Sequence, residues 1–390
     1  MRVLFSSFDE VPSFKGAATH ILGGLCEVIK THQVNLITLG TQPIPSASNF
    51  THVPLHIPER NYFLRGQLFR KRIAQWLAVH AVDLIHFRSP WEGVPAIRSG
   101  VPCIYEVNGV PSVELKYYYP ALPDSVLAMF RQWERYCVER AVAMLVPSTR
   151  TKSFLVNTYQ VDPGKVCVFP NARAAIDPQR WYPESEASHL RGVYIGSLSP
   201  WQGLQWGAKA FHKLADRFTL DVYTPAADTT LRRFARRLHR LGLEHNIVIH
   251  PAKPMSLLRQ DLKRYDFALT PLLKTARNTL QGCCPIKTLD YLCAGLPNVA
   301  SDLEVNRAWI EHGTTGLLFE PNRLSSLHST LEDLWSSRQS LPHIRQACLQ
   351  RAQKIWTWSE YSRTLSDFYA ELRPAMSQSP QDTARALVPN

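Results

Sequence analysis

The sequence predicts an α/β protein made of two doubly wound, Rossmann-like domains in tandem. Short apolar runs alternate with longer helical stretches along nearly the whole chain, which is typical of parallel sheets covered on both faces. The alternation is interrupted over residues 176–188, where Pro178, Pro183 and Ser185 indicate a linker. At 390 residues the chain also exceeds what one hydrophobic core usually organises. We therefore expect one domain over residues 1–188 and a second over 189–355.

Six apolar runs are expected to form the strands of the first domain. They lie at residues 3–6, 34–39, 84–87, 103–107, 143–146 and 166–169. Each run is followed by polar, glycine or proline residues and then, in most cases, by a helical stretch. This order favours parallel pairing of the strands.

A second series of strands is expected in the other half of the chain. Its runs lie at residues 192–196, 220–223, 247–250, 267–270, 298–301 and 317–319. Helical periodicity from about residue 342 to residue 372 closes the series, and the polar segment 373–390 is expected to be a disordered tail. In such folds ligands bind beyond the carboxyl ends of the strands, so we expect the site between the two domains.

The amino-acid composition indicates the charge of the binding partner but does not identify the partner. The net charge of +12 favours an anionic partner, such as a nucleotide, a phosphorylated acceptor or a lipid surface. The eight cysteines form no C-x-x-C pair, which predicts reduced thiols in a cytoplasmic protein rather than disulfides or a zinc site. We expect no metal site and no membrane span, because neither ligand clusters nor a run of about 18 apolar residues is present.

Two loops are candidates for binding phosphate. Gly16 and Ala17 open a helix after the first strand, and small residues at a helix start let phosphate approach the N–H groups. Gly196 and Ser197 follow the first strand of the second domain in the same way. The alternative for each loop is a purely structural role, because small residues at a helix start also serve packing.

The segment 281–304 combines a short helix with two charged side chains. Pro285 suits the first helical turn, and the apolar stripe leaves Lys287 and Asp290 on other faces. A cation and a carboxylate at the mouth of a parallel sheet are suited to a phosphate and a ribose.

These motifs together resemble the family 4 retaining glycosyltransferases, which have the GT-B fold. The resemblance rests on the small-residue loop, on Pro170-Asn171, on the GSLSPWQG segment, and on PIKTLDYLCAGLPNVASD followed by GTTGLLFEP. It covers the chain from residue 1 to about 372. It implies two domains with a cleft between them, with the final helix over 356–372 crossing back to the first domain.

The resemblance implies transfer of a sugar from a UDP- or GDP-sugar to an acceptor hydroxyl, with retention and with neither cofactor nor metal. Asp290 would hold the ribose, and Cys284, Pro285 and Ile286 would belong to the donor loop. Ser197 and Gln202 stand where the family commonly has an arginine and a lysine, so Lys287 is the leading substitute for the missing charge. Lys274 and Arg277 are second choices for that role, with a solvated surface as the alternative.

Further departures from the family pattern concern the sugar and the acceptor. Gln281 and Asn108 stand near the positions of a family glutamate and histidine, and both are expected beside the donor sugar. The carboxylate role of that glutamate would then be absent, or be taken by Asp302 or Glu304. In the first domain, Arg88, Glu106 and Glu114 are candidates for the acceptor side, with a salt-bridged loop as the alternative. His20 is expected to have a capping or packing role.

The acceptor is expected to be a glycan, a glycolipid or a small metabolite, and nucleic acid is not expected. The segment 65–80 has Arg70, Lys71 and Arg72 beside Phe69, Ile73, Trp76 and Leu77 at helical spacing. Such a helix can rest on the anionic inner face of a membrane with its apolar side down, or pack into the core with a charged outer face. Two other functions remain open: a domain pair that binds a nucleotide sugar without turnover, and an epimerase or hydrolase on the same fold.

Overall fold

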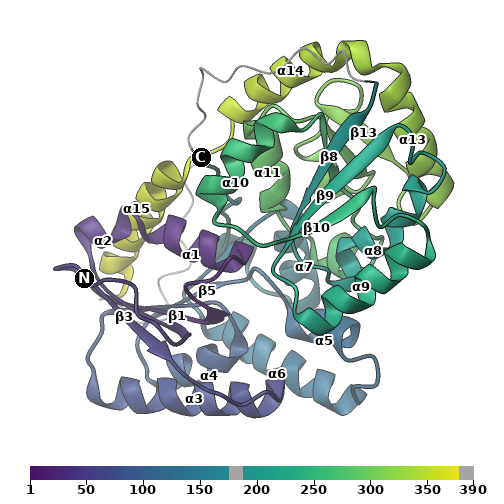
Figure 1. Ribbon diagram of the computed structural model, residues 1–390. Helices are drawn as coiled ribbons and strands as arrows, with labels where there is room; N and C mark the ends of the chain where they lie inside the picture. Colours follow the sequence, from purple (N-terminus) through teal and green to yellow (C-terminus); the bar gives the residue numbers. More distant parts are fainter. Residues whose placement is uncertain (175–187, 377–390) are drawn as a thin grey trace.

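The computed structural model describes residues 1–174 and 188–376, which form two parallel sheets with helices on both faces (Figure 1). The first domain holds a seven-stranded sheet in the order β3-β2-β1-β4-β5-β6-β7. The second holds a six-stranded sheet in the order β10-β9-β8-β11-β12-β13. The predicted fold class, two doubly wound domains, is confirmed.

The elements of the first domain follow the predicted alternation. Its strands are β1 (Arg2–Glu10), β2 (Gln33–Leu39), β3 (Phe50–Leu55), β4 (Leu84–Phe87), β5 (Cys103–Glu106), β6 (Ala143–Val146) and β7 (Val166–Val168). Its helices are α1 (Gly16–Leu25), α2 (Val28–Thr31), α3 (Tyr62–Val79), α4 (Pro90–Arg98), α5 (Pro111–Tyr118), α6 (Asp124–Arg140) and α7 (Thr149–Tyr159). The strand β3 was not among the strands expected from the sequence, and it contains Pro54, a residue that disfavours a strand interior. It fits here because β3 lies at the edge of the sheet.

The second domain repeats this plan. Its strands are β8 (Leu190–Ile195), β9 (Phe218–Thr224), β10 (Ile247–Pro251), β11 (Phe267–Thr270), β12 (Asn298–Ser301) and β13 (Gly316–Phe319). Its helices are α8 (Leu204–Gly207), α9 (Asp228–Arg240), α10 (Met255–Asp261), α11 (Ile286–Cys293), α12 (Glu304–Arg307), α13 (Leu324–Ser336) and α14 (Leu341–Gln353), and α15 (Trp358–Met376) follows them. In both sheets the order reverses beside the first strand of the domain, and the carboxyl ends of the strands there are the usual place for a ligand.

The continuous helical pattern expected from about residue 342 is in fact two helices. α14 ends at Gln353 and α15 begins at Trp358. Arg173 fills the break, since its backbone N–H donates to the Trp356 carbonyl at 2.9 Å and its carbonyl accepts from the Trp358 N–H at 2.9 Å. Thr357 and Glu360 then cap the new helix, with the Thr357 N–H donating to Glu360 Oε2 at 2.7 Å. The break lets the chain turn back toward the first domain.

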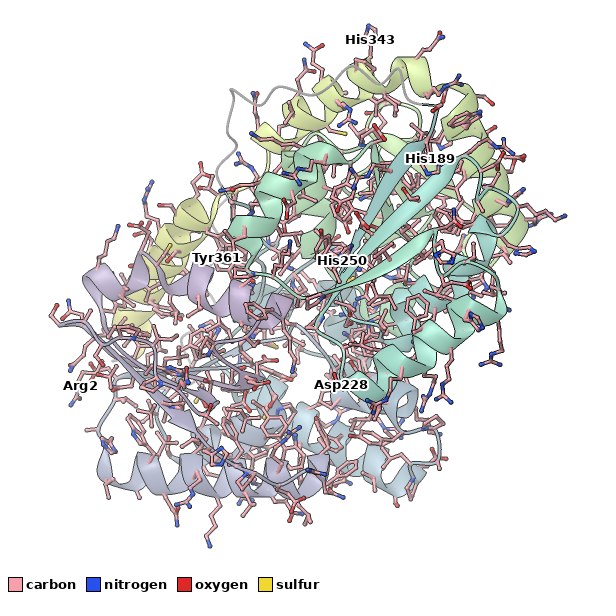
Figure 2. All side chains as sticks on the ribbon, in the orientation of Figure 1. Arg2, His189, Asp228, His250, His343 and Tyr361 are labelled. Atoms are coloured by element: carbon pink, nitrogen blue, oxygen red, sulfur yellow. The ribbon has the colours of Figure 1, made fainter. Side chains whose placement is uncertain are left out.

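α15 packs against α1 and α2 of the first domain, so the predicted return of the final helix is confirmed (Figure 1). Tyr361, labelled in Figure 2, is completely buried between α15 and α1, and Tyr369 and Leu372 join the same core. The hydroxyl of Ser362 accepts from the backbone N–H groups of Glu27 and Val28 at 2.7 and 3.2 Å. The last helix therefore completes the core of the first domain.

Two expectations concern segments at the edge of what the structure describes. Residues 176–187 of the expected linker and 377–390 of the expected tail lie outside the described residues. The tail was expected from residue 373, but α15 runs to Met376. Within the described ranges, no helix has the length and apolar character needed to cross a bilayer.

The helix α3 buries the apolar side that the sequence singled out. Phe69 and Ile73 are completely buried in the core of the first domain, so these two side chains do not contact lipid. The core-packed alternative holds for these two residues. The charged outer face includes Lys71 and Arg72.

The contact between α1 and α15 depends on a glycine. A Cβ atom added to Gly23 would lie 2.4 Å from the ring of Trp358. We expect Gly23→Ala to lower the free energy of unfolding by about 1–3 kcal/mol through overpacking, measured by urea denaturation. The double variant Gly23→Ala/Trp358→Leu should cost less than the sum of the two single variants, by about 1 kcal/mol. Purely additive costs would contradict this packing.

Candidate active site

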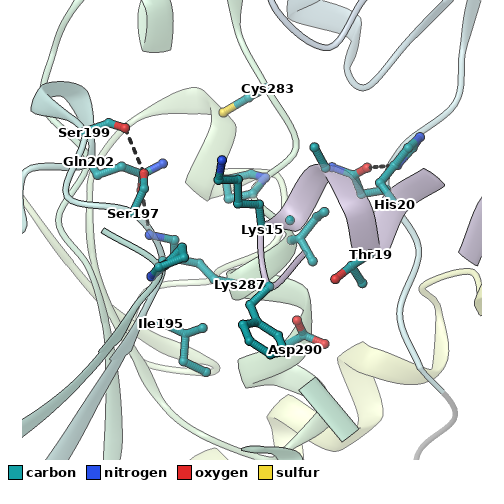
Figure 3. A pocket seen from close by; sticks show the side chains of 18 of the residues that line it. Lys15, Thr19, His20, Ile195, Ser197, Ser199, Gln202, Cys283, Lys287 and Asp290 are labelled. Carbon is teal, nitrogen blue, oxygen red and sulfur yellow. Dashed lines mark hydrogen bonds between the residues drawn. The ribbon is translucent and has the colours of Figure 1, made fainter. Parts of the chain in front are cut away.

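A cavity of about 710 Å³ lies between the two domains, beyond the carboxyl ends of their strands (Figure 3). The first domain lines it with the loop after β1, the start of α1 and the ends of β4 and β5. The second domain lines it with the loops after β8 to β11 and the start of α11. Among its lining residues are five basic side chains and only one carboxylate, namely Lys15, Arg88, Lys253, Arg277, Lys287 and Asp290.

Most of the predicted site residues meet in this cavity. Those that line it are Gly16, Ala17, Arg88, Asn108, Gly196, Ser197, Gln202, Cys284, Pro285, Ile286, Lys287 and Asp290. Gln281, Glu106 and Glu114 do not line it. Each of these three instead makes polar contacts just behind the wall. Lys274, a second choice for the missing charge, does not line the cavity, whereas Arg277 does.

Lys287 projects from the first turn of α11 toward the loop after β8 (Figure 3). Its Nζ donates to Gln202 Oε1 at 2.6 Å and lies 4.2 Å from the ring centroid of Tyr194. Gly196 has φ of +144°, and a Cβ there would lie 2.9 Å from Lys287 Nζ, so the loop needs glycine at this point. Removal from bulk water lowers the pKa of Lys287 to about 7, and the charge of Arg277 acts in the same direction.

The two uncharged residues of the β8 loop have defined contacts. Ser197 Oγ and Ser199 Oγ lie 2.8 Å apart, and the Ser197 carbonyl accepts from the Tyr194 hydroxyl at 2.6 Å. Gln202 ends a short turn before Gly203, whose φ of +74° lets the backbone pass close to the carbonyl of Pro271. The amide of Gln202 therefore supplies no charge but holds the ammonium group that does.

Asp290 lies one turn further along α11 and is buried at the cavity wall. Its Oδ1 lies 3.3 Å from Nη2 of Arg259, on α10. Burial raises the pKa of Asp290, and the charge of Arg259 opposes that rise. Sequence reasoning missed Arg259, because nothing in the chain between residues 259 and 290 signals that α10 covers α11.

Glu114 of the first domain contacts the segment 277–281 of the second domain. It accepts from Gln281 Nε2 at 2.8 Å and lies 3.2 Å from Nε of Arg277 through the same oxygen. Arg277 and Gln281 belong to a single π-helical turn. Burial works against the charge of Arg277, but the nearby Cys283 and Glu114 hold its pKa above its ordinary value. Arg277 therefore faces the cavity as a fixed cation.

Glu106 lies at the centre of a buried cluster in the first domain. Its carboxylate lies 2.5 Å from His20 Nε2, 3.1 Å from His86 Nε2 and 3.4 Å from Arg88 Nε, and it also accepts from the amide of Asn108. Burial alone favours the neutral acid, yet His20 and Arg88 hold the pKa of Glu106 well below its usual range. The cluster fixes Arg88, Asn108 and His20, all of which line the cavity.

A short chain of contacts leads from this cluster to the second domain. His20 Nδ1 lies 2.7 Å from Asn171 Oδ1, and Asn171 Nδ2 donates to the carbonyl of Cys284 at 2.6 Å. His20 therefore positions the loop before α11 through Asn171. Its expected packing role is part of the observed one, because its ring also meets Tyr361 edge-on at 5.4 Å.

Both halves of the chain match models of glycosyltransferase families. Residues 14–175 match the family described as Glycosyltransferase Family 4, and residues 190–337 match the one described as Glycosyl transferases group 1. The chain is a family 4 glycosyltransferase. No curated protein matches it in sequence.

Solved structures confirm the GT-B fold of this glycosyltransferase. Sucrose-phosphate synthase from Thermosynechococcus elongatus is 12% identical with a TM-score of 0.78, and the match covers 96% of this chain and 99% of that one. HepE from Anabaena, in complex with UDP and glucose, is 14% identical with a TM-score of 0.71, covering 95% and 99%. The catalytic domain of starch synthase IV from Arabidopsis thaliana, bound to ADP and acarbose, is 10% identical with a TM-score of 0.68, covering 96% and 99%. At these identities the likeness establishes the fold.

The buried charge of Glu106 should be essential to the stability of the glycosyltransferase. We expect Glu106→Gln to lower the free energy of unfolding by about 3–5 kcal/mol, because it leaves buried cations without their counter-charge. The carboxylate has a lowered pKa in the folded state, so its contribution is present above pH of about 4 and is lost as the pH falls. Urea denaturation at several pH values checks this.

The control is Asp83→Asn, which removes the partner of the exposed Arg2 at the start of β1. Its cost should be below about 1 kcal/mol. Equal costs for the two variants, or a Glu106→Gln cost that persists unchanged in acid, would contradict the role of Glu106.

Proposed function

We propose that the enzyme transfers a sugar from a UDP- or GDP-sugar to an acceptor hydroxyl, with retention of anomeric configuration and without a metal ion. The observation that carries this proposal is the excess of cations in the described lining of the cavity, which includes five basic side chains and one carboxylate. A nucleoside diphosphate has the opposite charge. The structures of HepE with UDP and glucose and of starch synthase IV with ADP and acarbose support a donor of this class.

The diphosphate would be held from three sides of the cavity. Lys287 and Arg277 supply charge from the second domain, in place of the uncharged Ser197 and Gln202. The start of α1 at Gly16 and Ala17 adds the N–H groups of a first helical turn, which favour anions. These groups would stabilise the charge that develops on the leaving phosphate. In the described part of the chain, no group of three or more His, Cys, Asp or Glu side chains is arranged to hold a metal ion. The cationic side chains would therefore carry out this task.

The polar groups around the rest of the cavity suit the remaining parts of the donor. The buried carboxylate of Asp290 would accept from the ribose hydroxyls, as the family resemblance implies. Asn108, fixed by Glu106, would position a sugar hydroxyl. Gln281 lies behind the cavity wall and would contribute indirectly, by its contact with Glu114, which also holds Arg277. None of these amides can take a proton, so the leaving phosphate would accept the proton of the acceptor hydroxyl.

The acceptor would enter from the first domain. Arg88 is the acceptor-side candidate that lines the cavity, and Asp9 Oδ2 lies 2.8 Å from its Nη1. Glu106 and Glu114 would contribute by fixing Arg88 and the wall rather than by direct contact. The acceptor class is a hydroxyl of a glycan, a glycolipid or a small metabolite.

Binding of a nucleotide sugar without turnover is the second candidate. It is favoured by Ser197 and Gln202, which provide no charge where the family commonly has two cations. The two candidates differ in one observable, since only the enzyme releases UDP or GDP from the donor.

Replacement of Lys287 tests both candidates. We expect the wild-type protein to release nucleotide from at least one UDP- or GDP-sugar in a panel with mixed acceptors, and EDTA to leave that release unchanged. Lys287→Met should weaken UDP or GDP binding about 10- to 100-fold, which is the value of a charged hydrogen bond, and should slow release at least as much. Lys274→Met is the matched control, and it should change neither.

Two outcomes would contradict the proposal. Binding of the donor without release under every acceptor would favour the second candidate. Equal effects of Lys287→Met and Lys274→Met on the nucleotide affinity measured by calorimetry would show that Lys287 does not bind the diphosphate.

The pKa of Lys287 predicts how binding depends on pH. Since the pKa is about 7 in the free cavity and a diphosphate must raise it, binding takes up a proton above pH 7. We expect UDP or GDP affinity to fall about tenfold per pH unit above 7, until the pKa of the complex is reached. Calorimetry in two buffers with different ionisation enthalpies measures the proton uptake directly.

Lys287→Arg is the control for this dependence, because an arginine keeps its charge over the whole range. Its affinity should be nearly constant between pH 7 and 9. A wild-type affinity that is equally constant, with no proton uptake, would show that Lys287 does not meet the diphosphate.

A further inference from the structure

The outer face of α3 and the end of α5 carry an exposed apolar strip that the cavity does not explain. Leu64 and Leu68, one turn apart on α3, are 50% and 45% exposed. Tyr118 and Tyr119, at the end of α5, are 52% and 40% exposed. Clusters of exposed large apolar side chains mark an interaction surface more often than isolated ones do.

The strip is continuous with the cavity. Tyr119 packs against Tyr62 and Phe63, at the start of α3, with ring centroids 6.1 and 5.7 Å apart. Its neighbour Tyr118 lines the cavity and meets Trp201 edge-on at 4.9 Å. An apolar chain lying on the strip would therefore lead from α3 directly to the entrance of the cavity.

Positive charge surrounds the strip. α3 contains four basic residues and no acidic residue. A separate hollow of about 760 Å³ borders α3, and Arg70, Lys71 and Arg98 line it without any acidic side chain. Lys71 and its neighbour Arg72 are exposed, and neither forms an ion pair with any residue in the described ranges. This face is complementary to anionic headgroups beside an apolar layer.

We propose that this face docks the enzyme on an anionic lipid bilayer, and that the acceptor is an amphiphile whose apolar part lies on the strip. Its hydroxyl would reach the cavity past Tyr118. The assignment of the acceptor rests on the proposed transferase function. The docking on a bilayer does not depend on that function. A second copy of the chain is a poor occupant, since two such faces would bring like charges together.

The side chains that would contact the bilayer differ from those that the sequence indicated. Phe69 and Ile73 belong to the core, and the side chains that would enter the bilayer are Leu64 and Leu68, in the first half of the helix. Tyr62 and Phe63, which precede them on α3, contact Tyr119, and its neighbour Tyr118 lines the cavity. Docking through Leu64 and Leu68 therefore brings the cavity close to the bilayer surface, where an amphiphilic acceptor is found.

Vesicle flotation of the full chain tests the docking. We expect binding to phosphatidylcholine vesicles that contain phosphatidylglycerol to be at least about tenfold tighter than binding to pure phosphatidylcholine. Lys71→Gln/Arg72→Gln should weaken binding to the mixed vesicles about 30-fold, and Leu64→Gln/Leu68→Gln about tenfold. Circular dichroism verifies that each variant is folded.

Arg232→Gln/Arg236→Gln is the matched control, since it removes the same charge from exposed positions on α9 in the second domain. It should reduce vesicle binding less than threefold, as expected of distant charges that are largely screened. Equal losses in the α3 and α9 variants would overturn the proposal, as would equal binding of the wild type to both kinds of vesicle. Dimerisation in solution that Leu64→Gln/Leu68→Gln abolishes would also overturn it in favour of a second copy.

The acceptor is tested separately. With mixed vesicles that carry a total lipid extract as acceptor source, Leu64→Gln/Leu68→Gln should lower sugar incorporation into lipid at least about tenfold, following its loss of binding. Its UDP and GDP affinity should equal that of the wild type. Incorporation that survives in this variant would overturn the amphiphile assignment. If the wild type does not bind UDP or GDP at all, the proposed function is refuted. The docking on vesicles would remain supported by the flotation result.

Discussion

The carboxylate of Glu106 holds together the first-domain half of the cleft. It lies at the end of β5 and meets His20 from α1, His86 and Arg88 from the end of β4, and the amide of Asn108. A buried charge is tolerated only where opposite charges and donors surround it, so these elements must meet at Glu106 for the domain to fold. The last helix joins the same cluster, because the Tyr369 hydroxyl lies 2.5 Å from His86 Nδ1.

The same cluster explains how the two domains share one site. His20 contacts Asn171, and Asn171 donates to the carbonyl of Cys284 in the donor loop. On the other side of the cleft, Glu114 accepts from Gln281. Polar interdomain contacts of this kind are weaker than an apolar core, and relative domain motion is therefore the ordinary expectation. Both contacts end on the segment from Gln281 to Cys284, so any such motion acts directly on the donor loop.

Sequence reasoning found the strands and the loop and helix over residues 281–293 because both are encoded locally. Parallel strands read as short apolar runs, and α11 has its own start, stripe and stop. The cluster around Glu106 could not be found in this way, since His20 and Glu106 are 86 positions apart and meet only through the order of the sheet. Thr357 and Glu360 did signal the start of α15 locally, but the apolar periodicity on both sides concealed the break.

The two charged side chains of α11 respond to the cavity in opposite senses. Burial lowers the pKa of Lys287 and raises that of Asp290, so the free cavity disfavours the charged form of each. A diphosphate and a ribose would reverse both effects, because one supplies negative charge and the other supplies donors.

The free protein thus bears an electrostatic cost that a matching ligand removes, and a ligand with only one of the two parts removes less. If the cavity binds the proposed donor, Lys287 and Asp290 would together favour a nucleoside diphosphate over a simple phosphate. Such selectivity would follow from their shared burial on one short helix rather than from any single contact.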